Sequence, residues 1–140
     1  QDIEYEKNLQ QLKATSSSIW EVIQKLYANQ LHNLETEGGE LVPAFYEYFL
    51  VGWRDTSRSE LLQKRYQKGI ERFEKLLQEG VHNGEFTPSM NLNDLSKLVS
   101  SFQEGIVTHA ITIGVQAANT RLQFDALLQY LYSLLHLKSE

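Results

Sequence analysis

The chain has 140 residues, 41% of them hydrophobic and 22% charged, which suffices for one domain with its own core and does not resemble a disordered segment. Its formal net charge of −5 argues against a nucleic-acid surface, because phosphate binding requires clustered lysine and arginine. The lack of cysteine excludes disulfides and thiolate sites, and no apolar run approaches the ~20 residues of a membrane span.

The first residues already have the composition of a helix interior. The chain begins with Gln1 rather than methionine, and no signal peptide opens it. We therefore expect a fragment from which an upstream part is missing. Residues 2–12 are predicted to form a polar helix, and the Thr/Ser run at residues 15–18 offers N-caps for the next one. Apolar side chains at steps of three and four predict that this second helix spans residues 18–37.

A short helix is predicted after Pro43, a residue favoured near helix starts. Its apolar side chains point in every direction as far as Trp53, so we expect it in the middle of the domain. A long helix capped by Thr56 or Ser57 follows. It carries one apolar stripe: Leu62, Tyr66, Ile70, Phe73 and Leu77.

The long helix ends in the stretch LLQEGVHNGEF, which has two possible interpretations. Glu79 and His82 have the spacing of two metal ligands on one helix face, but no second Glu-x-x-His pair occurs to complete a di-metal site. The other interpretation is a helix stop. Gly84 suits the left-handed position after a helix, and Phe86 can fold back over it. The sequence therefore predicts a cap and no metal site.

Two more helices complete the chain. Asn91 or Asn93 is predicted to cap the first, which contains Gly105, a residue that suggests close packing there. The last helix is predicted at residues 123–137, with apolar residues on two sides. No strand pattern occurs, so we predict an all-α domain of about six helices.

The order of these elements resembles a known family. A long amphipathic helix ending E-G-x-x-x-G-E-F, then Pro88, then a capped helix containing Glu104-Gly105-Ile106, resembles the C-terminal domain of TetR-family transcriptional regulators. The segment YEYFLVGWRDTSRSELLQKRYQKGIERFEKLLQEGVHNGEF is similar to the AcrR-like branch. The resemblance covers essentially the whole chain and is strongest over residues 41–113.

The resemblance implies an orthogonal bundle of about six helices that dimerises through its last two long helices. Residues 1–140 would be the regulatory domain of a cytoplasmic bacterial repressor, and the N-terminal helix-turn-helix domain is not in this chain. Operator DNA would then be bound only through that missing domain. The partners of this chain would be a second copy of itself and a small-molecule effector.

Aromatic side chains on the inward faces of four consecutive helices favour a small-molecule pocket, and the resemblance implies a ligand cavity there. The alternative is a solid core in a helical protein–protein interaction module. His109 is either a satisfied buried histidine or a hydrogen-bonding contact to the ligand. We predict that a hydrophobic or amphipathic effector contacts Trp20, Ile23, Tyr27, Phe45, Phe49, Trp53, Tyr66, Ile70, Phe102, Ile106 and His109.

The last helix has more apolar surface than one monomer can bury, which predicts a homodimer. Gln103 and Glu104 fit either a pocket or the dimer face, and the dimer face is favoured for Gln103. The interface, shared with the monomer core, is predicted to use Val99, Gln103, Leu127, Tyr130, Leu131 and Leu134.

No catalytic constellation is recognisable. The serines lie in neither a G-x-S-x-G nor an S-x-x-K context, and no glycine-rich phosphate loop occurs. The sequence therefore predicts a protein that is not an enzyme and has no cofactor.

Overall fold

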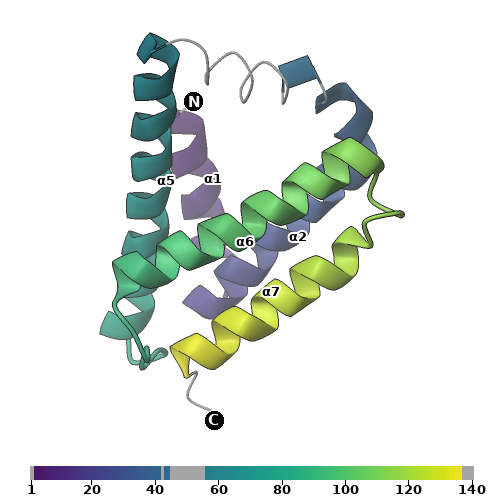
Figure 1. Ribbon diagram of the computed structural model, residues 1–140. Coiled ribbons are helices and arrows are strands. Elements are labelled where there is room, and N and C mark those ends of the chain that lie inside the picture. The colour runs from purple at the N-terminus through teal and green to yellow at the C-terminus, as the bar shows by residue number, and fades with distance from the viewer. Residues whose placement is uncertain (1, 42, 45–55, 137–140) are drawn as a thin grey trace.

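The computed structural model describes residues 2–41, 43–44 and 56–136. Within these ranges the chain is all-helical and contains no strand. Of the short helix predicted around Pro43, only Pro43 and Ala44 are described, and both are helical. The helices, labelled as in Figure 1, are α1 (Asp2–Ala14), α2 (Ile19–Glu37), the 3-10 helix η1 (Gly38–Leu41), α5 (Thr56–His82), α6 (Leu92–Ile113) and α7 (Thr120–Leu135).

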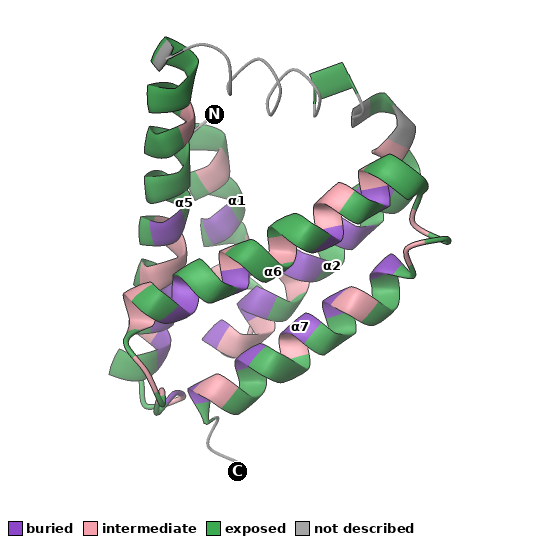
Figure 2. Cartoon of the chain, viewed as in Figure 1, coloured by how far each residue is buried: buried purple, intermediate pink, exposed green. Residues whose placement is uncertain are grey.

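The helices form two groups that cross at a steep angle (Figure 1). Helices α6 and α7 run antiparallel beside each other, with α2 packed against both. Helix α5 crosses α6 near the start of α6. Helix α1 lies beside α5, joined to it by side-chain contacts. The buried side chains lie mainly where α2, α6 and α7 face one another (Figure 2), and they include Ile23, Leu95, Ile106, Leu127 and Leu131.

The start of α2 is fixed by a reciprocal pair of caps. The hydroxyl of Ser18 accepts a hydrogen bond from the backbone N–H of Glu21 at 3.0 Å. The carboxylate of Glu21 reaches back and accepts from the hydroxyl and the N–H of Ser17, at 2.6 and 3.0 Å. This arrangement resembles the capping box, which satisfies backbone donors that a helix start leaves free. The predicted N-cap in the serine run is therefore confirmed.

The end of α5 is the cap that the sequence predicts. Gly84 has a φ of 83°, in the left-handed region. Its N–H donates to the carbonyl of Val81 at 3.1 Å, and the N–H of Glu85 donates to that of Gly80 at 2.8 Å. These two bonds make a Schellman motif, which satisfies carbonyls at a helix end. Phe86 folds back against Gly80 and is only 3% exposed.

The segment after α5, residues 83–89, also contacts the ends of two other helices. The carboxylate of Glu85 accepts hydrogen bonds from the N–H groups of Ile19 and Trp20, at 3.0 and 3.2 Å, at the start of α2. At the end of α7, the N–H of Thr87 donates to the carbonyl of Leu135 at 2.9 Å. The N–H of Ser89 donates to the carbonyl of Leu134 at 3.0 Å. One short loop therefore joins three helix ends.

The starts of the last two helices can be compared with their predicted starts. Asn91 caps α6, with its side chain accepting from the N–H of Asp94 at 3.1 Å, as predicted. Helix α7 begins at Thr120, three residues before the predicted start at Gln123. The reason is a tight turn in which Asn119 adopts φ 49°, so that the chain enters the helix sooner than its polar composition suggested.

Candidate functional site

A partly open cavity of about 440 Å³ lies between α1, α2, α5 and α6. Its apolar wall consists of Leu26, Ile70, Phe73, Val99 and Val107, and the rings of Tyr5 and Tyr27 add aromatic surface. The polar side chains in the wall come from three helices: Gln30, Arg72, Ser96, Ser100, Gln103 and Glu104. A largely apolar wall with a few convergent polar groups is typical of small-molecule sites, and so is this size.

The polar part of the wall is organised around two amides. The side-chain N–H of Gln103 donates to the side-chain carbonyl of Gln30 at 2.7 Å, which joins α6 to α2 across the cavity. Each amide keeps one further polar group for another partner. Tyr27 is buried and its ring packs against Phe124 with 5.9 Å between centroids. Burial raises the pKa of the Tyr27 hydroxyl, so it is a neutral hydrogen-bonding group at physiological pH.

Helix α1 contributes to the cavity through Tyr5. The guanidinium carbon of Arg72 lies 4.3 Å from the centre of the Tyr5 ring, a cation–π contact between α5 and α1. Burial raises the pKa of Tyr5, and the neighbouring Arg72 partly offsets that shift. Lys13 and Glu79 form an ion pair of 2.8 Å farther along the same two helices. One wall of the cavity therefore belongs to the first helix of the chain.

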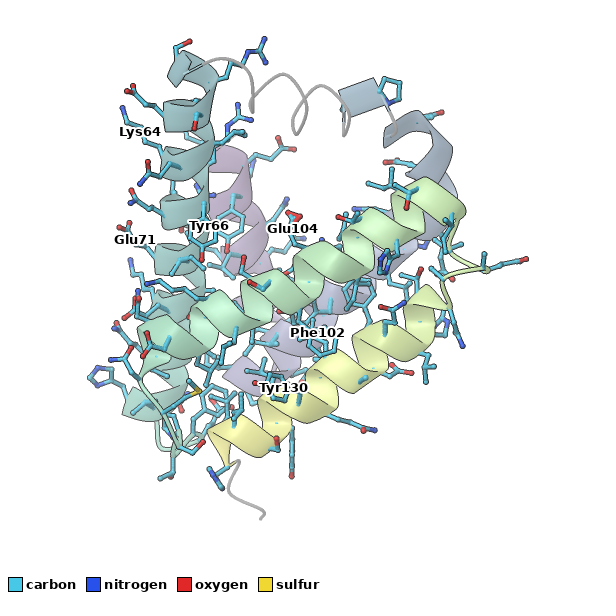
Figure 3. The ribbon with its side chains drawn as sticks, viewed as in Figure 1. Lys64, Tyr66, Glu71, Phe102, Glu104 and Tyr130 are labelled. Carbon is cyan, nitrogen blue, oxygen red and sulfur yellow. The ribbon has the colours of Figure 1, made fainter. Side chains whose placement is uncertain are left out.

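Glu104 stands out among the groups of the cavity. It lies on the side of α6 that faces α5, opposite to Phe102 (Figure 3). Glu104 is an exposed residue, but partial desolvation of its carboxyl group raises its pKa. It forms no ion pair or hydrogen bond with the residues that the structure describes.

A second groove of about 530 Å³ runs between α1 and α2. Most of its wall is exposed and polar, including Asn8, Asn29, His32 and Asn33. Among the described residues, those that line this groove come from α1 and α2 alone. The cavity at α6 is therefore the better candidate for a ligand site.

The Glu79–His82 pair does not belong to a metal site in the part of the chain described. Glu79 pairs with Lys13, and His82 is the exposed last residue of α5. Among the described residues no three His, Cys, Asp or Glu side chains are grouped closely enough to hold a metal ion. Nor does any described helix combine the length and the apolar character that crossing a bilayer requires.

Comparison with known proteins identifies the family. Residues 21–121 match a family model described as the C-terminal domain of tetracycline-repressor-like proteins, and this match covers well over half of the chain. The chain belongs to the TetR family. The recognition made from the helix order and the Gly84 cap is thereby confirmed.

A relative described as a transcriptional regulator is consistent with this assignment. The Bacillus subtilis (strain 168) protein described as an uncharacterized HTH-type transcriptional regulator, YfiR, is 30% identical over 122 residues. The aligned part covers 87% of this chain and 60% of the relative. The chain therefore spans about three fifths of the length of the relative that it matches.

The predicted ligand contacts of this TetR-like domain fall into four groups. Tyr27 and Ile70 line the cavity. Trp20 packs on Tyr132 instead, with 5.5 Å between ring centroids. Phe45, Phe49 and Trp53 lie outside the described residues. The others do not line the cavity: Ile23 and Ile106 are in the core, and Tyr66, Phe102 and His109 are exposed.

The predicted dimer residues also divide. Val99, Leu127 and Leu131 are at most 1% exposed within one copy of the TetR-like domain, so they cannot form a surface for a partner. Val99 and Gln103 line the cavity, because the side of α6 on which they lie faces α2 and α5. Tyr130 is 37% exposed and lies next to Phe102, with 6.1 Å between ring centroids (Figure 3). Leu134 is half-buried.

Several cavity residues were missed from the sequence. Tyr5, Gln30, Ser96 and Ser100 were not predicted as ligand contacts, although they line the cavity. A signal for some of them was present, since Ser96, Ser100, Gln103 and Val107 recur at steps of three and four along one side of α6. Three of these four residues are polar, which distinguishes them from the apolar core positions of α6.

Proposed function

We propose that this chain is the effector-binding and dimerisation domain of a bacterial transcriptional repressor acting in the cytoplasm. The observation that carries this proposal is the cavity between α1, α2, α5 and α6, with its apolar wall and its Gln30–Gln103 amide pair. A hydrophobic or amphipathic small molecule fits a site of this size and composition. The net charge of −5 agrees with a domain that does not itself bind DNA.

The effector acts through α1 in this proposal. Tyr5 of α1 is part of the cavity wall, and α1 is joined to α5 by the Tyr5–Arg72 contact and the Lys13–Glu79 ion pair. A molecule that binds one position of α1 more tightly shifts the domain toward that position. In the intact protein this shift changes the separation of two helix-turn-helix domains, and with it the affinity for operator DNA.

The dimer of this proposal forms on the exposed side of α6 and α7. Leu98, Phe102 and Tyr130 are between 37% and 45% exposed there. Gly105 lies on the same side of α6, and among the described residues nothing would come within 4 Å of a Cβ added to it. A glycine in a helix costs about 1 kcal/mol relative to alanine, and close approach by a partner helix is a reason to keep it. A two-fold axis covers such a surface with a second copy of itself.

A thermal-shift screen of the purified chain against hydrophobic compounds tests the effector site. A compound that binds only the folded state stabilises it, by about 2.7 kcal/mol at a concentration of 100 times Kd. Ser100→Phe, which places a ring in the cavity, is expected to abolish the shift. Ser101→Phe is the matched control, because Ser101 is exposed and does not line the cavity.

The outcomes distinguish an effector-binding domain from a helical protein–protein interaction module. Shifts that survive in Ser101→Phe and vanish in Ser100→Phe support an effector site in the cavity. No shift with any compound in a broad screen favours the helical interaction module without a ligand. Equal shifts in both variants would move the binding site elsewhere.

A further inference from the structure

We infer that the effector is an elongated molecule, with an apolar part in the cavity and an uncharged, hydroxyl-rich head in the groove between α1 and α2. The inference rests on the proposed function, because it extends the same site and names the chemistry of the molecule that binds there. Three observations support it. The two spaces adjoin, the groove is lined by amides without protein partners, and its described wall contains no acidic residue, lysine or arginine.

The cavity and the groove adjoin along one edge. Tyr5, Leu26 and Gln30 line both of them. Tyr5 is held toward α5 by its contact with Arg72, and Gln30 is held toward α6 by its hydrogen bond with Gln103. Within the described part of the chain, no hydrogen bond joins Tyr5 to Gln30. A ligand that fills the cavity therefore has a path between these two side chains into the groove.

The groove has an apolar floor and a polar rim. Leu9 of α1 is buried, and Leu12 of α1 and Leu26 of α2 are half-buried. The rim consists of exposed amides from both helices: Asn8, Gln11, Asn29 and Asn33. None of these four side chains forms a hydrogen bond with another described residue. An amide both donates and accepts, as a hydroxyl group does, so a rim of this kind suits a sugar or another polyol.

The charge of the groove argues against an ionic head. Its described wall contains no aspartate, glutamate, lysine or arginine. An ionic head would therefore lose part of its hydration there without gaining a side chain of opposite charge. The charged side chains of the combined site, Arg72 and Glu104, line the cavity instead. An uncharged head that forms several hydrogen bonds is the better match for the groove.

The cavity suits the other part of such a molecule. Ile70, Phe73 and Val99 supply apolar surface, and an alkyl chain placed against them is removed from water. Joining the two parts in one molecule strengthens binding, because the head meets the groove at a high effective concentration once the chain is in the cavity. The matching chemical class is a lipophilic glycoside.

The test uses probes with the same alkyl chain and different heads: octyl glucoside, octanol, octanoate and octylammonium, all below their micelle concentrations. Calorimetry measures their affinities for the wild-type chain and three variants. The double variant Asn29→Ala/Asn33→Ala removes two amides of the rim. Its matched control is Gln24→Ala/Gln78→Ala, because both of these amides are exposed and lie outside the cavity and the groove. Ser100→Phe fills the cavity.

Octyl glucoside is expected to bind the wild type about tenfold more tightly than octanol, as for a net gain of one or two hydrogen bonds. The variant Asn29→Ala/Asn33→Ala is expected to lose most of that advantage and to bind octanol as the wild type does. The control is expected to retain the advantage, and Ser100→Phe is expected to weaken the binding of both probes.

Three outcomes overturn the inference and leave the effector site in the cavity standing. They are a glucoside that binds no more tightly than octanol, tightest binding of octanoate or octylammonium, and an advantage of the glucoside that survives in Asn29→Ala/Asn33→Ala. An octanol affinity that Ser100→Phe does not change, or no binding of any probe, counts against the proposed function as well.

Discussion

The ring of Phe86 lies directly over the α-carbon of Gly80, so close that a Cβ on Gly80 would overlap ring carbons Cδ2 and Cε2. The carbonyl of Gly80 accepts the N–H of Phe86 at 3.2 Å, which holds the ring in that place. Glycine is required at this position for space and not for its backbone conformation, because Gly80 is an ordinary helical residue of α5.

Gly80→Ala is therefore expected to destabilise the domain, by about 1–3 kcal/mol, because the ring of Phe86 must move. Gly69→Ala in the same helix provides the control. Nothing would come within 4 Å of a Cβ there among the described residues, so that change is expected to stabilise the helix by up to about 1 kcal/mol. Chemical denaturation measures both. The same sign for the two variants would show that Phe86 does not determine the requirement for glycine.

Glu85→Ala tests the connection between the loop and α2. The change removes the acceptor for the N–H groups of Ile19 and Trp20 and leaves the start of α2 with fewer partners. We expect a loss of about 1–2 kcal/mol in the free energy of unfolding, as for other helix caps. Glu79→Ala, which removes an ion pair with partly exposed partners, is expected to cost less than 1 kcal/mol. An equal loss for both would contradict the cap.

The carboxyl group of Glu21 provides a test by titration. Hydrogen bonds from the Ser17 hydroxyl, then from its N–H, lower the pKa of Glu21 to about 2, and Lys25 contributes. A lowered folded-state pKa means that the stabilisation is present above the ordinary pKa and is lost as pH falls toward 2. We expect NMR titration to give that pKa in the wild type and a value nearer the ordinary one in Ser17→Ala. An unchanged pKa in the variant would show that Ser17 is not the cause.

Glu104→Gln tests a carboxyl group whose pKa is shifted in the opposite direction. Burial raises the pKa of Glu104, so the charged carboxylate costs stability, and the cost grows as pH rises through the folded-state pKa. In the absence of ligand we expect Glu104→Gln to melt at a higher temperature than the wild type at pH 7. The difference should vanish below the ordinary glutamate pKa of about 4. A variant that melts lower at pH 7 would show that the carboxylate has a stabilising partner.

Gly105→Arg tests the dimer. Gly105 has open space around it in one copy, so an arginine there is expected to leave the monomer folded and to block the approach of a second copy. Light scattering of the wild type is expected to give about twice the 16.2 kDa of one chain, and Gly105→Arg one chain mass. Gln78→Arg, on the exposed surface of α5, is the control and should remain dimeric. A monomeric wild type at micromolar concentration would exclude the interface.

The helices and their ends were predictable because their signals are local. Asn91, Ser18 and Gly84 each act on backbone groups within a few residues, so the sequence alone identifies them. The orientation of α6 was not predictable in this way. Its apolar stripe shows that a face is buried but not which helix buries it, and Val99 and Gln103 were assigned to a partner although they face the cavity.

The cavity itself depends on side chains that are distant in sequence. Gln30 and Gln103 are 73 residues apart, and nothing in either helix alone indicates that they meet. Tyr5 was missed for a similar reason, because α1 is polar and its contact with Arg72 arises only when α5 lies beside it. The aromatic composition predicted a pocket but did not identify most of the residues in the wall of the cavity.

The loop at residues 83–89 has a mechanical consequence. Because this loop is bonded to the ends of α2 and α7, α5 is anchored at its C-terminal end. Gly69, in the cavity wall, lies 13 residues before His82, which is about 20 Å along a helix. A tilt of about 5° around the anchored end therefore moves Gly69 by about 2 Å. A small change in the angle of α5 is enough to widen or narrow the cavity while all three helix ends stay joined.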